Sequence, residues 1–161
     1  MTLYERVFPK WQKDKRFRVF GDESGPGVSL TWLGTASFVV RTATTTVLVD
    51  PYVTRLGLPG LLFGHEPDER AIASAFPSVV DAIVCGHSHY DHVADAPRIA
   101  KRTGAVLVGS ESTCAWGEAE GLPKDKLVAM GSRGGVVTVG DVEIRLVPSA
   151  HGKVVLHRVP F

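Results

Sequence analysis

The sequence feature that most constrains the fold is a short apolar segment followed at once by a dense polar cluster. Residues 82–85 read Ala-Ile-Val-Cys, which is typical of a buried β-strand, and residues 86–92 read Gly-His-Ser-His-Tyr-Asp-His. The pattern over residues 93–102 then predicts a helix. A strand, a polar loop and a helix in this order place the cluster at the carboxyl end of a sheet strand, where open α/β sheets bind ligands.

Four side chains of this cluster are potential metal ligands, namely His87, His89, Asp91 and His92. Alternate residues of an extended loop project to the same side, so His87 and His89 can converge on one ion. Asp91 and His92 follow as the chain turns into the helix, and they point to a neighbouring position. Imidazole and carboxylate groups are the ligand types expected for zinc or another borderline divalent metal. The alternative interpretation is a surface cluster of polar residues in a loop.

Segments rich in β-branched residues lie on both sides of the cluster and predict strands. The first three should form an antiparallel meander that stops at Asp50-Pro51, because proline cannot continue the ladder. These strands are expected at residues 28–33, 37–41 and 45–49. Later strands are expected at 105–108, 136–139, 142–147 and 154–159, with helices at 67–76 and 111–120. Strands that alternate with helices in the middle of the chain predict an α/β fold, a mixed sheet with flanking helices.

The composition is that of one folded domain. The 161 residues are 44% hydrophobic and 22% charged, so we expect a real core and no extensive disorder. The net charge of +1 gives no broad field to attract nucleic acid or an anionic membrane. Without an apolar leader or a window of about 18 apolar residues, we expect no transmembrane segment and a cytoplasmic location. The polar residues 1–27 are expected to be an N-terminal extension to a domain over 28–161.

The His-x-His-x-Asp-His motif in this setting resembles the metallo-β-lactamase superfamily. Three further stretches are similar to that family. Residues 32–38 (Trp-Leu-Gly-Thr-Ala-Ser-Phe) look like the glycine turn of the branch that contains ascorbate-6-phosphate lactonases and N-acylphosphatidylethanolamine-hydrolysing phospholipases D. Residues 48–51 (Leu-Val-Asp-Pro) resemble a family strand that ends in Asp, and residues 149–152 (Ser-Ala-His-Gly) resemble the strand end that supplies a third histidine.

The resemblance implies a divalent metal centre with one or two ions, zinc first and manganese or iron as alternatives. His87, His89 and His151 would bind the first metal, and Asp91 and His92 would bind the second. The nucleophile would be a metal-bound water or hydroxide, which the ion makes more acidic. Asp91 would then be the catalytic residue that orients this water and takes its proton.

Three further residues, Asp50, His65 and His157, have less specific expected roles. Asp50 would support the ligand loop or accept an imidazole N–H, and its alternative interpretation is a plain carboxylate at a strand end. His65 lies in an irregular loop, where it either contacts substrate or is a solvated loop histidine. His157 lies within the last strand pattern and is expected to be structural or exposed.

The resemblance also implies an αββα sandwich, of which this chain supplies mainly the first half. The domain is therefore expected to be truncated at its C-terminus. A missing C-terminal half or a homo-oligomer would complete the sandwich and the ligand set.

The function implied by the resemblance is a metal-dependent hydrolase that cleaves a phosphodiester or a lactone in a small-molecule or lipid-like substrate. One alternative is a metal-binding module without catalysis, or a truncated and inactive half. Another is a nuclease of the same superfamily, which the near-neutral charge disfavours because such an enzyme needs a basic groove.

Overall fold

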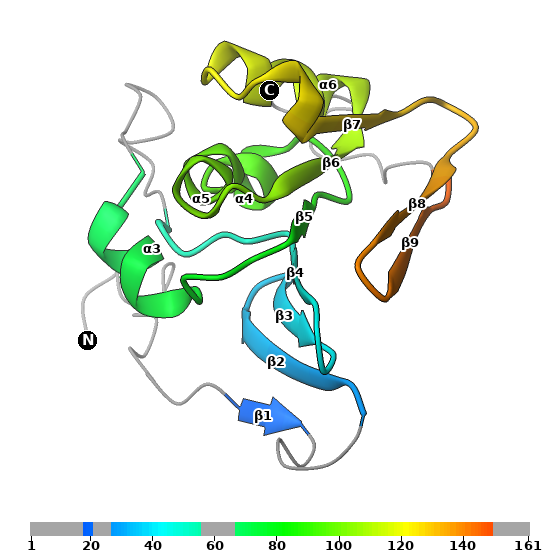
Figure 1. Ribbon diagram of the computed structural model, residues 1–161. Coiled ribbons are helices and arrows are strands. Elements are labelled where there is room, and N and C mark those ends of the chain that lie inside the picture. The colour runs from blue at the N-terminus through cyan, green and yellow to red at the C-terminus, as the bar shows by residue number, and fades with distance from the viewer. Residues whose placement is uncertain (1–17, 21–26, 56–66, 150–161) are drawn as a thin grey trace, which may run out of the picture.

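The computed structural model describes residues 18–20, 27–55 and 67–149, and Figure 1 shows how they are arranged. A seven-stranded sheet runs in the order β1-β2-β3-β4-β5-β6-β7, and β8 and β9 form a second, two-stranded sheet. The pairs from β1 to β4 are antiparallel, and those from β4 to β7 are parallel. Within the described ranges, no helix has the length and apolar composition that crossing a membrane requires. The predicted α/β class with a mixed sheet is confirmed.

The antiparallel part of the sheet confirms the predicted meander. Its strands are β2 (Ser29–Gly34), β3 (Ser37–Arg41) and β4 (Thr46–Val49). One strand was not expected: β1 (Arg18–Phe20), which lies within residues 1–27 and pairs with β2. Its three residues carry too short a pattern to be recognised without the partner strand.

The parallel part alternates strands with helices. Its strands are β5 (Ala82–Val84), β6 (Val106–Ser110) and β7 (Leu127–Met130), and its longer helices are α3 (Glu69–Ala75), α5 (Ala96–Thr103) and α6 (Glu111–Ala119). A 3₁₀ helix, η1 (Lys124–Lys126), leads into β7. β7 was not predicted, because its Leu-Val-Ala-Met pattern contains a single β-branched residue.

The helix expected over residues 93–102 is wrong in its extent. The chain instead forms a short helix α4 (Tyr90–Val93) and then α5, which begins at Ala96. Pro97 explains the break, because it has no N–H to donate to the carbonyl of Val93 and its ring would clash with that carbonyl. The first helix also starts earlier than predicted, at Tyr90, inside the polar cluster.

The large sheet is covered differently on its two faces, as Figure 1 shows. The helices pack against one face around a core that includes Leu48, Ile72, Ile83, Ile99 and Leu107. The hairpin of β8 (Gly135–Val139) and β9 (Val142–Leu146) packs against the other face, where Ile144 meets Val47, Ala82 and Val108. The hairpin itself was predicted, whereas the strand expected at 154–159 lies outside the described residues.

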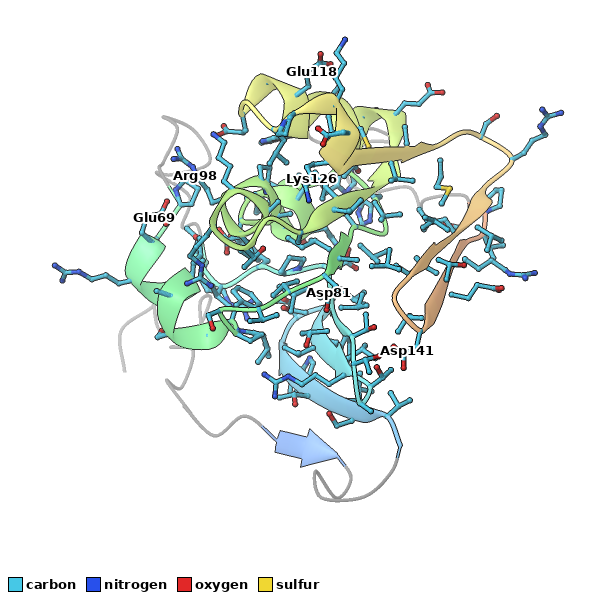
Figure 2. The ribbon with its side chains drawn as sticks, viewed as in Figure 1. Glu69, Asp81, Arg98, Glu118, Lys126 and Asp141 are labelled. Carbon is cyan, nitrogen blue, oxygen red and sulfur yellow. The ribbon has the colours of Figure 1, made fainter. Side chains whose placement is uncertain are left out.

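Polar contacts at its turn fix the hairpin to the large sheet. Thr42 Oγ1 donates to Asp141 Oδ1 at 2.7 Å, and the Asp141 N–H donates to Thr45 Oγ1 at 3.2 Å. Asp141 lies at the tip of the hairpin in Figure 2. Hydrogen bonds from Thr45 and Thr42 lower the pKa of Asp141, so its carboxylate stays charged in this contact. The hairpin is thereby held over the strands that carry the polar cluster.

A buried carboxylate organises the break between α4 and α5. Asp95 is fully buried, and its oxygens accept hydrogen bonds from the Val53 N–H at 2.6 Å and the Thr54 N–H at 2.9 Å. The Thr54 hydroxyl donates to the same carboxylate. Asp95 therefore ties the segment after β4 to the start of α5, across about forty residues of sequence.

Replacing Asp95 with alanine leaves these buried donors without an acceptor. We expect Asp95→Ala to lower the free energy of unfolding by about 2–4 kcal/mol. Urea denaturation followed by circular dichroism measures this change. As a control, Asp125→Ala removes an exposed carboxylate from η1 and should change the unfolding free energy by less than about 0.5 kcal/mol. Equal stabilities of the two variants would contradict the role given to Asp95.

Candidate metal centre

The ligand loop, defined here as residues 86–92, starts where β5 ends and is held by the end of the neighbouring strand β4. Asp50 follows β4 with a φ of 44°, a left-handed conformation that Asp tolerates better than most residues. Its N–H donates to the Val84 carbonyl at 2.8 Å, and its Oδ1 accepts the Gly86 N–H at 2.7 Å. A Cβ added at Gly86 would lie 3.4 Å from Oδ2 of Asp50, so the carboxylate packs directly against the start of the loop.

The second oxygen of the same carboxylate contacts a histidine of the loop. Nδ1 of His92 lies 2.9 Å from Oδ2 of Asp50, and both side chains are largely buried. This contact raises the pKa of His92, while partial burial acts in the opposite direction. One carboxylate therefore holds both ends of the ligand loop, Gly86 at its start and His92 at its end.

Three imidazoles of the ligand loop lie against one another. Nε2 of His87 is 2.9 Å from Nδ1 of His89, and the two ring centroids are 4.4 Å apart. The ring centroids of His87 and His92 are 4.0 Å apart. The structure thus brings together the three histidines that the sequence singled out in this loop.

The other candidate residues are either more exposed or lie outside the described residues. Asp91 is more exposed, and its Oδ2 lies 3.9 Å from Nε2 of His92. His65 and His151 lie outside the described residues, as does His157. Across the residues that the structure describes, no set of three or more His, Cys, Asp or Glu side chains is arranged as a complete metal site. The ligand loop therefore offers a cluster of donors that lacks the full geometry of a metal site.

The chemistry of this donor set suits a metal. Imidazole nitrogens are ligands that zinc and related divalent metals prefer. Two nitrogens that share one tetrahedral zinc lie about 3.3 Å apart, given Zn–N bonds of about 2.0–2.1 Å. The nitrogens of His87 and His89 that face each other are 2.9 Å apart and hydrogen-bonded, so an ion bound by both would replace this hydrogen bond.

An aromatic and cationic cluster, missed by the sequence analysis, supports the ligand loop. The Tyr52 and Tyr90 rings meet edge to face, with centroids 6.1 Å apart. The Arg55 guanidinium lies 5.5 Å from the Tyr52 ring centroid and donates to Thr35 Oγ1 at 2.9 Å and to the Leu33 carbonyl at 3.1 Å. Burial lowers the pKa of Arg55. The cluster links the β2–β3 turn to the start of α4, but its residues follow no local pattern.

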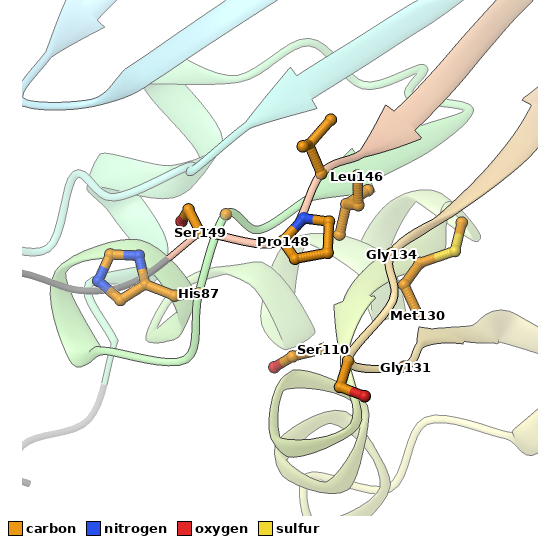
Figure 3. A pocket seen from close by; sticks show the side chains of 11 residues that line it. His87, Ser110, Met130, Gly131, Gly134, Leu146, Pro148 and Ser149 are labelled. Atoms are coloured by element: carbon orange, nitrogen blue, oxygen red, sulfur yellow. The ribbon is translucent and has the colours of Figure 1, made fainter.

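A pocket of about 390 Å³ opens beside the ligand loop, and Figure 3 shows it from close by. Its wall includes the loop residues Gly86 and His87, the end of β6 at Ser110, and the end of β7 with the turn after it. The segment after β9 closes it, with Val147, Pro148 and Ser149. His87 and Ser149 lie at one end, and Met130 lies at the other (Figure 3). Such a volume is in the range of small-molecule sites.

The turn between β7 and β8 shapes this pocket and depends on Gly134. The Gly134 N–H donates to the Gly131 carbonyl at 2.8 Å, and Gly134 has a φ of 72°. A Cβ there would overlap the carbonyl oxygen of Leu146 and come within 3.0 Å of Pro148. Only glycine lets β9 and the following segment approach the turn this closely.

The chain matches a family model described as a β-lactamase superfamily domain, over residues 29–159. A UPF0173 metal-dependent hydrolase of Anaeromyxobacter dehalogenans is 38% identical over 125 residues, which cover 76% of this chain and 42% of that protein. A metal-dependent hydrolase of Ruegeria is 36% identical and is covered to 49%. The chain spans about half the length of the curated relatives it matches.

Solved structures show the same fold. A metallo hydrolase of the hyperthermophilic archaeon Ignicoccus hospitalis is 25% identical, with a TM-score of 0.56 over 83% of this chain and 53% of that chain. The diiron β-hydroxylase CmlA from Streptomyces venezuelae is 22% identical, with a TM-score of 0.55 over 79% of this chain and 25% of that chain. The second likeness bears on the fold alone.

A substitution in the turn between β7 and β8 tests the packing around Gly134. We expect Gly134→Ala to lower the free energy of unfolding by about 1–3 kcal/mol, because the new methyl group collides with backbone at a positive φ. Thermal and urea unfolding measure the change. Gly131→Ala is a matched control in the same turn, where the nearest atom to an added Cβ is Oε1 of Glu111 at 3.9 Å. If the Gly134→Ala and Gly131→Ala variants are equally stable, the fold does not depend on the close packing of Leu146 and Pro148 against Gly134.

Proposed function

The chain belongs to the β-lactamase superfamily, and from this membership and the ligand loop we propose that it is the metal-binding part of a metal-dependent hydrolase. The proposed substrate bond is a phosphodiester or a lactone, in a small or lipid-like molecule. The proposed ligands are His87, His89 and His151 for a first divalent ion, and Asp91 and His92 for a second.

The observation that carries this proposal is the packing of three imidazoles at the carboxyl end of β5. Close packing of imidazoles avoids charge repulsion when the rings are neutral, and the neutral ring is the form that binds a metal. The His87 and His89 rings, with centroids 4.4 Å apart, are proposed to share the first ion, and the His92 ring, 4.0 Å from His87, lies beside them for the second. Zinc is the first candidate for these nitrogen donors, and manganese or iron suits them as well.

Asp50 supports the proposal by orienting one ligand. Its carboxylate lies beside Nδ1 of His92, which favours the proton on that nitrogen. The lone pair of Nε2 is then available to a metal. A carboxylate that partners a metal-binding histidine in this way fixes the tautomer and makes the ligand more basic.

A divalent cation in this centre would supply a Lewis acid that makes water acidic near neutral pH. Asp91 is the proposed general base, because its carboxylate is exposed beside the histidines, with Oδ2 3.9 Å from Nε2 of His92. It would accept a proton from the attacking water and return it to the leaving oxygen. His65 is proposed to contact the substrate.

The lactonase and phospholipase branch is proposed on the Trp32–Phe38 stretch. In the structure this stretch is a tight turn in which the Trp32 indole N–H donates to the Thr35 carbonyl at 2.9 Å. Arg55 connects the same turn to Tyr52 and thus to the ligand loop. Through these contacts, the stretch helps to support the proposed metal centre.

A second candidate function is metal binding without catalysis. It is favoured because, in the described part of the chain, the ligand loop does not form a complete metal site. Metal stoichiometry and turnover of a generic phosphodiester or lactone separate the two candidates.

The ligand assignment predicts how metal content responds to single substitutions. We expect His87→Ala and His89→Ala each to weaken zinc binding by at least about tenfold, because each removes one ligand of the first ion. Metal analysis of the purified and dialysed proteins measures the zinc that stays bound. His157→Ala is the control and should leave the zinc content unchanged. Equal zinc content in all three variants would show that the ligand assignment is wrong.

A further inference from the structure

We propose that Arg55 is a positioning residue of the metal centre, which holds the first turn of α4 in place through the rings of Tyr52 and Tyr90. The proposal rests on the metal-binding function proposed above and deepens it. It assigns to a cation outside the ligand loop a favourable effect on metal affinity, although its charge alone would repel a metal ion.

The first argument is the backbone of the residues involved. Within the described ranges, three residues other than glycine have a positive φ: Thr35 at 50°, Asp50 at 44° and Arg55 at 54°. A β-branched residue such as threonine rarely adopts this conformation, which persists only where the surroundings enforce it. Two of the three, Thr35 and Arg55, are joined directly by a hydrogen bond. An unfavourable backbone on both sides of one contact indicates that the contact has a role beyond local folding.

The second argument is how tightly the β2–β3 turn holds the Arg55 guanidinium. Its Nη1 donates to Thr35 Oγ1 at 2.9 Å, and its Nη2 donates to the Leu33 carbonyl at 3.1 Å. A Cβ added at Gly34 would lie 2.7 Å from Nη2, so glycine leaves room for the guanidinium. The turn itself is closed, because the Trp32 indole N–H donates to the Thr35 carbonyl at 2.9 Å. The guanidinium therefore has a fixed position and orientation.

The third argument is the contact of this cation with two aromatic rings. The guanidinium carbon lies 5.5 Å from the Tyr52 ring centroid, within the range of a cation–π interaction. Tyr52 is buried, and its ring meets the Tyr90 ring edge to face with centroids 6.1 Å apart. Tyr90 lies between the proposed ligands His89 and Asp91 in the chain. The position of the guanidinium thus reaches the ligand loop through two rigid side chains.

The fourth argument is that α4 needs contacts from outside. The helix has only four residues, and such a short helix has little stability of its own. Its N-cap residue, His89, directs its ring toward His87 and does not cap the helix with its side chain. The carboxylate of Asp50 holds His92. The Tyr90 ring supplies a second contact, which leads back to the guanidinium.

The segment that carries Tyr52 and Arg55 is held independently of the guanidinium. The buried carboxylate of Asp95 accepts the N–H groups of Val53 and Thr54, the two residues between them. Removing the guanidinium therefore leaves this segment anchored and releases only the contacts to the rings and to the turn. A substitution of Arg55 is accordingly expected to act on the metal centre in a protein that still folds.

The test measures zinc affinity by competition with a chromophoric chelator, and the visible absorption of bound Co²⁺, which reports the geometry of its ligands. We expect Arg55→Met to weaken zinc binding by about tenfold and to change the Co²⁺ spectrum. Loss of charge alone would instead strengthen zinc binding, so the sign of the change separates the two effects. Arg55→Lys keeps a cation but cannot reach both acceptors at once, so it should weaken binding by about threefold. It decides the test if Arg55→Met does not fold.

Two further variants complete the test. Tyr52→Leu should weaken zinc binding as much as Arg55→Met, and the double variant should bind no more weakly than either single variant, because both substitutions interrupt one connection. The matched control is Arg102→Met. It removes a guanidinium that donates from α5 to the Phe76 and Pro77 carbonyls, and it should leave zinc affinity unchanged. Folded Arg55→Met or Arg55→Lys protein with the zinc affinity and Co²⁺ spectrum of the unsubstituted chain overturns the proposal, and so does additive weakening in the double variant.

The metal-free chain separates this proposal from the proposed function. If the unsubstituted chain binds no zinc, the proposed function is wrong. The NMR signals of the His89 ring in the metal-free chain then decide the role of Arg55, since they should shift in Arg55→Met and stay unchanged in Arg102→Met. Unshifted His89 signals in both variants would show that Arg55 does not position the ligand loop.

Discussion

The carboxylate of Asp50 lies between the beginning and the end of the ligand loop and contacts both. Oδ1 accepts the Gly86 N–H at 2.7 Å, and Oδ2 lies 2.9 Å from Nδ1 of His92. With both ends fixed, the intervening histidines have little freedom, and their rings lie against one another. Without this carboxylate, Gly86 would lose its acceptor and His92 would lose the group that orients its ring. The geometry of the candidate centre therefore depends on a residue that need not bind the metal itself.

The helices and the hairpin that pack on the two faces of the large sheet place the pocket next to this centre. Helices pack on one face, and the β8–β9 hairpin packs on the other around Ile144. The contact between Thr42 and Asp141 holds the tip of the hairpin, so its other end reaches the carboxyl ends of β5, β6 and β7. The pocket wall thus comes from segments far apart in sequence, and its chemistry follows from how they meet.

Local patterns predicted much of the fold and part of the site. The β-branched runs of β2, β3, β4, β8 and β9, the hairpin turn and the strand before the ligand loop all have short-range signals, and these strands lie where they were expected, whereas β1 and β7 were not predicted. Asp50 was identified because residues 48–51 resemble a family strand that ends in Asp. The break at Asp95 was missed, although Pro97 carried a signal for it, because the apolar spacing outweighed the proline. The pocket and the contact between Tyr52 and Tyr90 had no such signal, since they arise only when distant segments pack together.

The most direct test of this account is the zinc affinity of the chain after substitution of Asp50, measured by competition with a chromophoric chelator. We expect Asp50→Ala to weaken zinc binding by about 10–100-fold, because the ligand loop loses both anchors. Asp50→Asn should have an intermediate effect, since its amide oxygen can still accept the Gly86 N–H while the negative charge beside His92 is lost. Unfolding curves recorded on the same samples show whether each variant is folded. Folded Asp50→Ala protein that binds zinc as tightly as the unsubstituted chain would contradict the account.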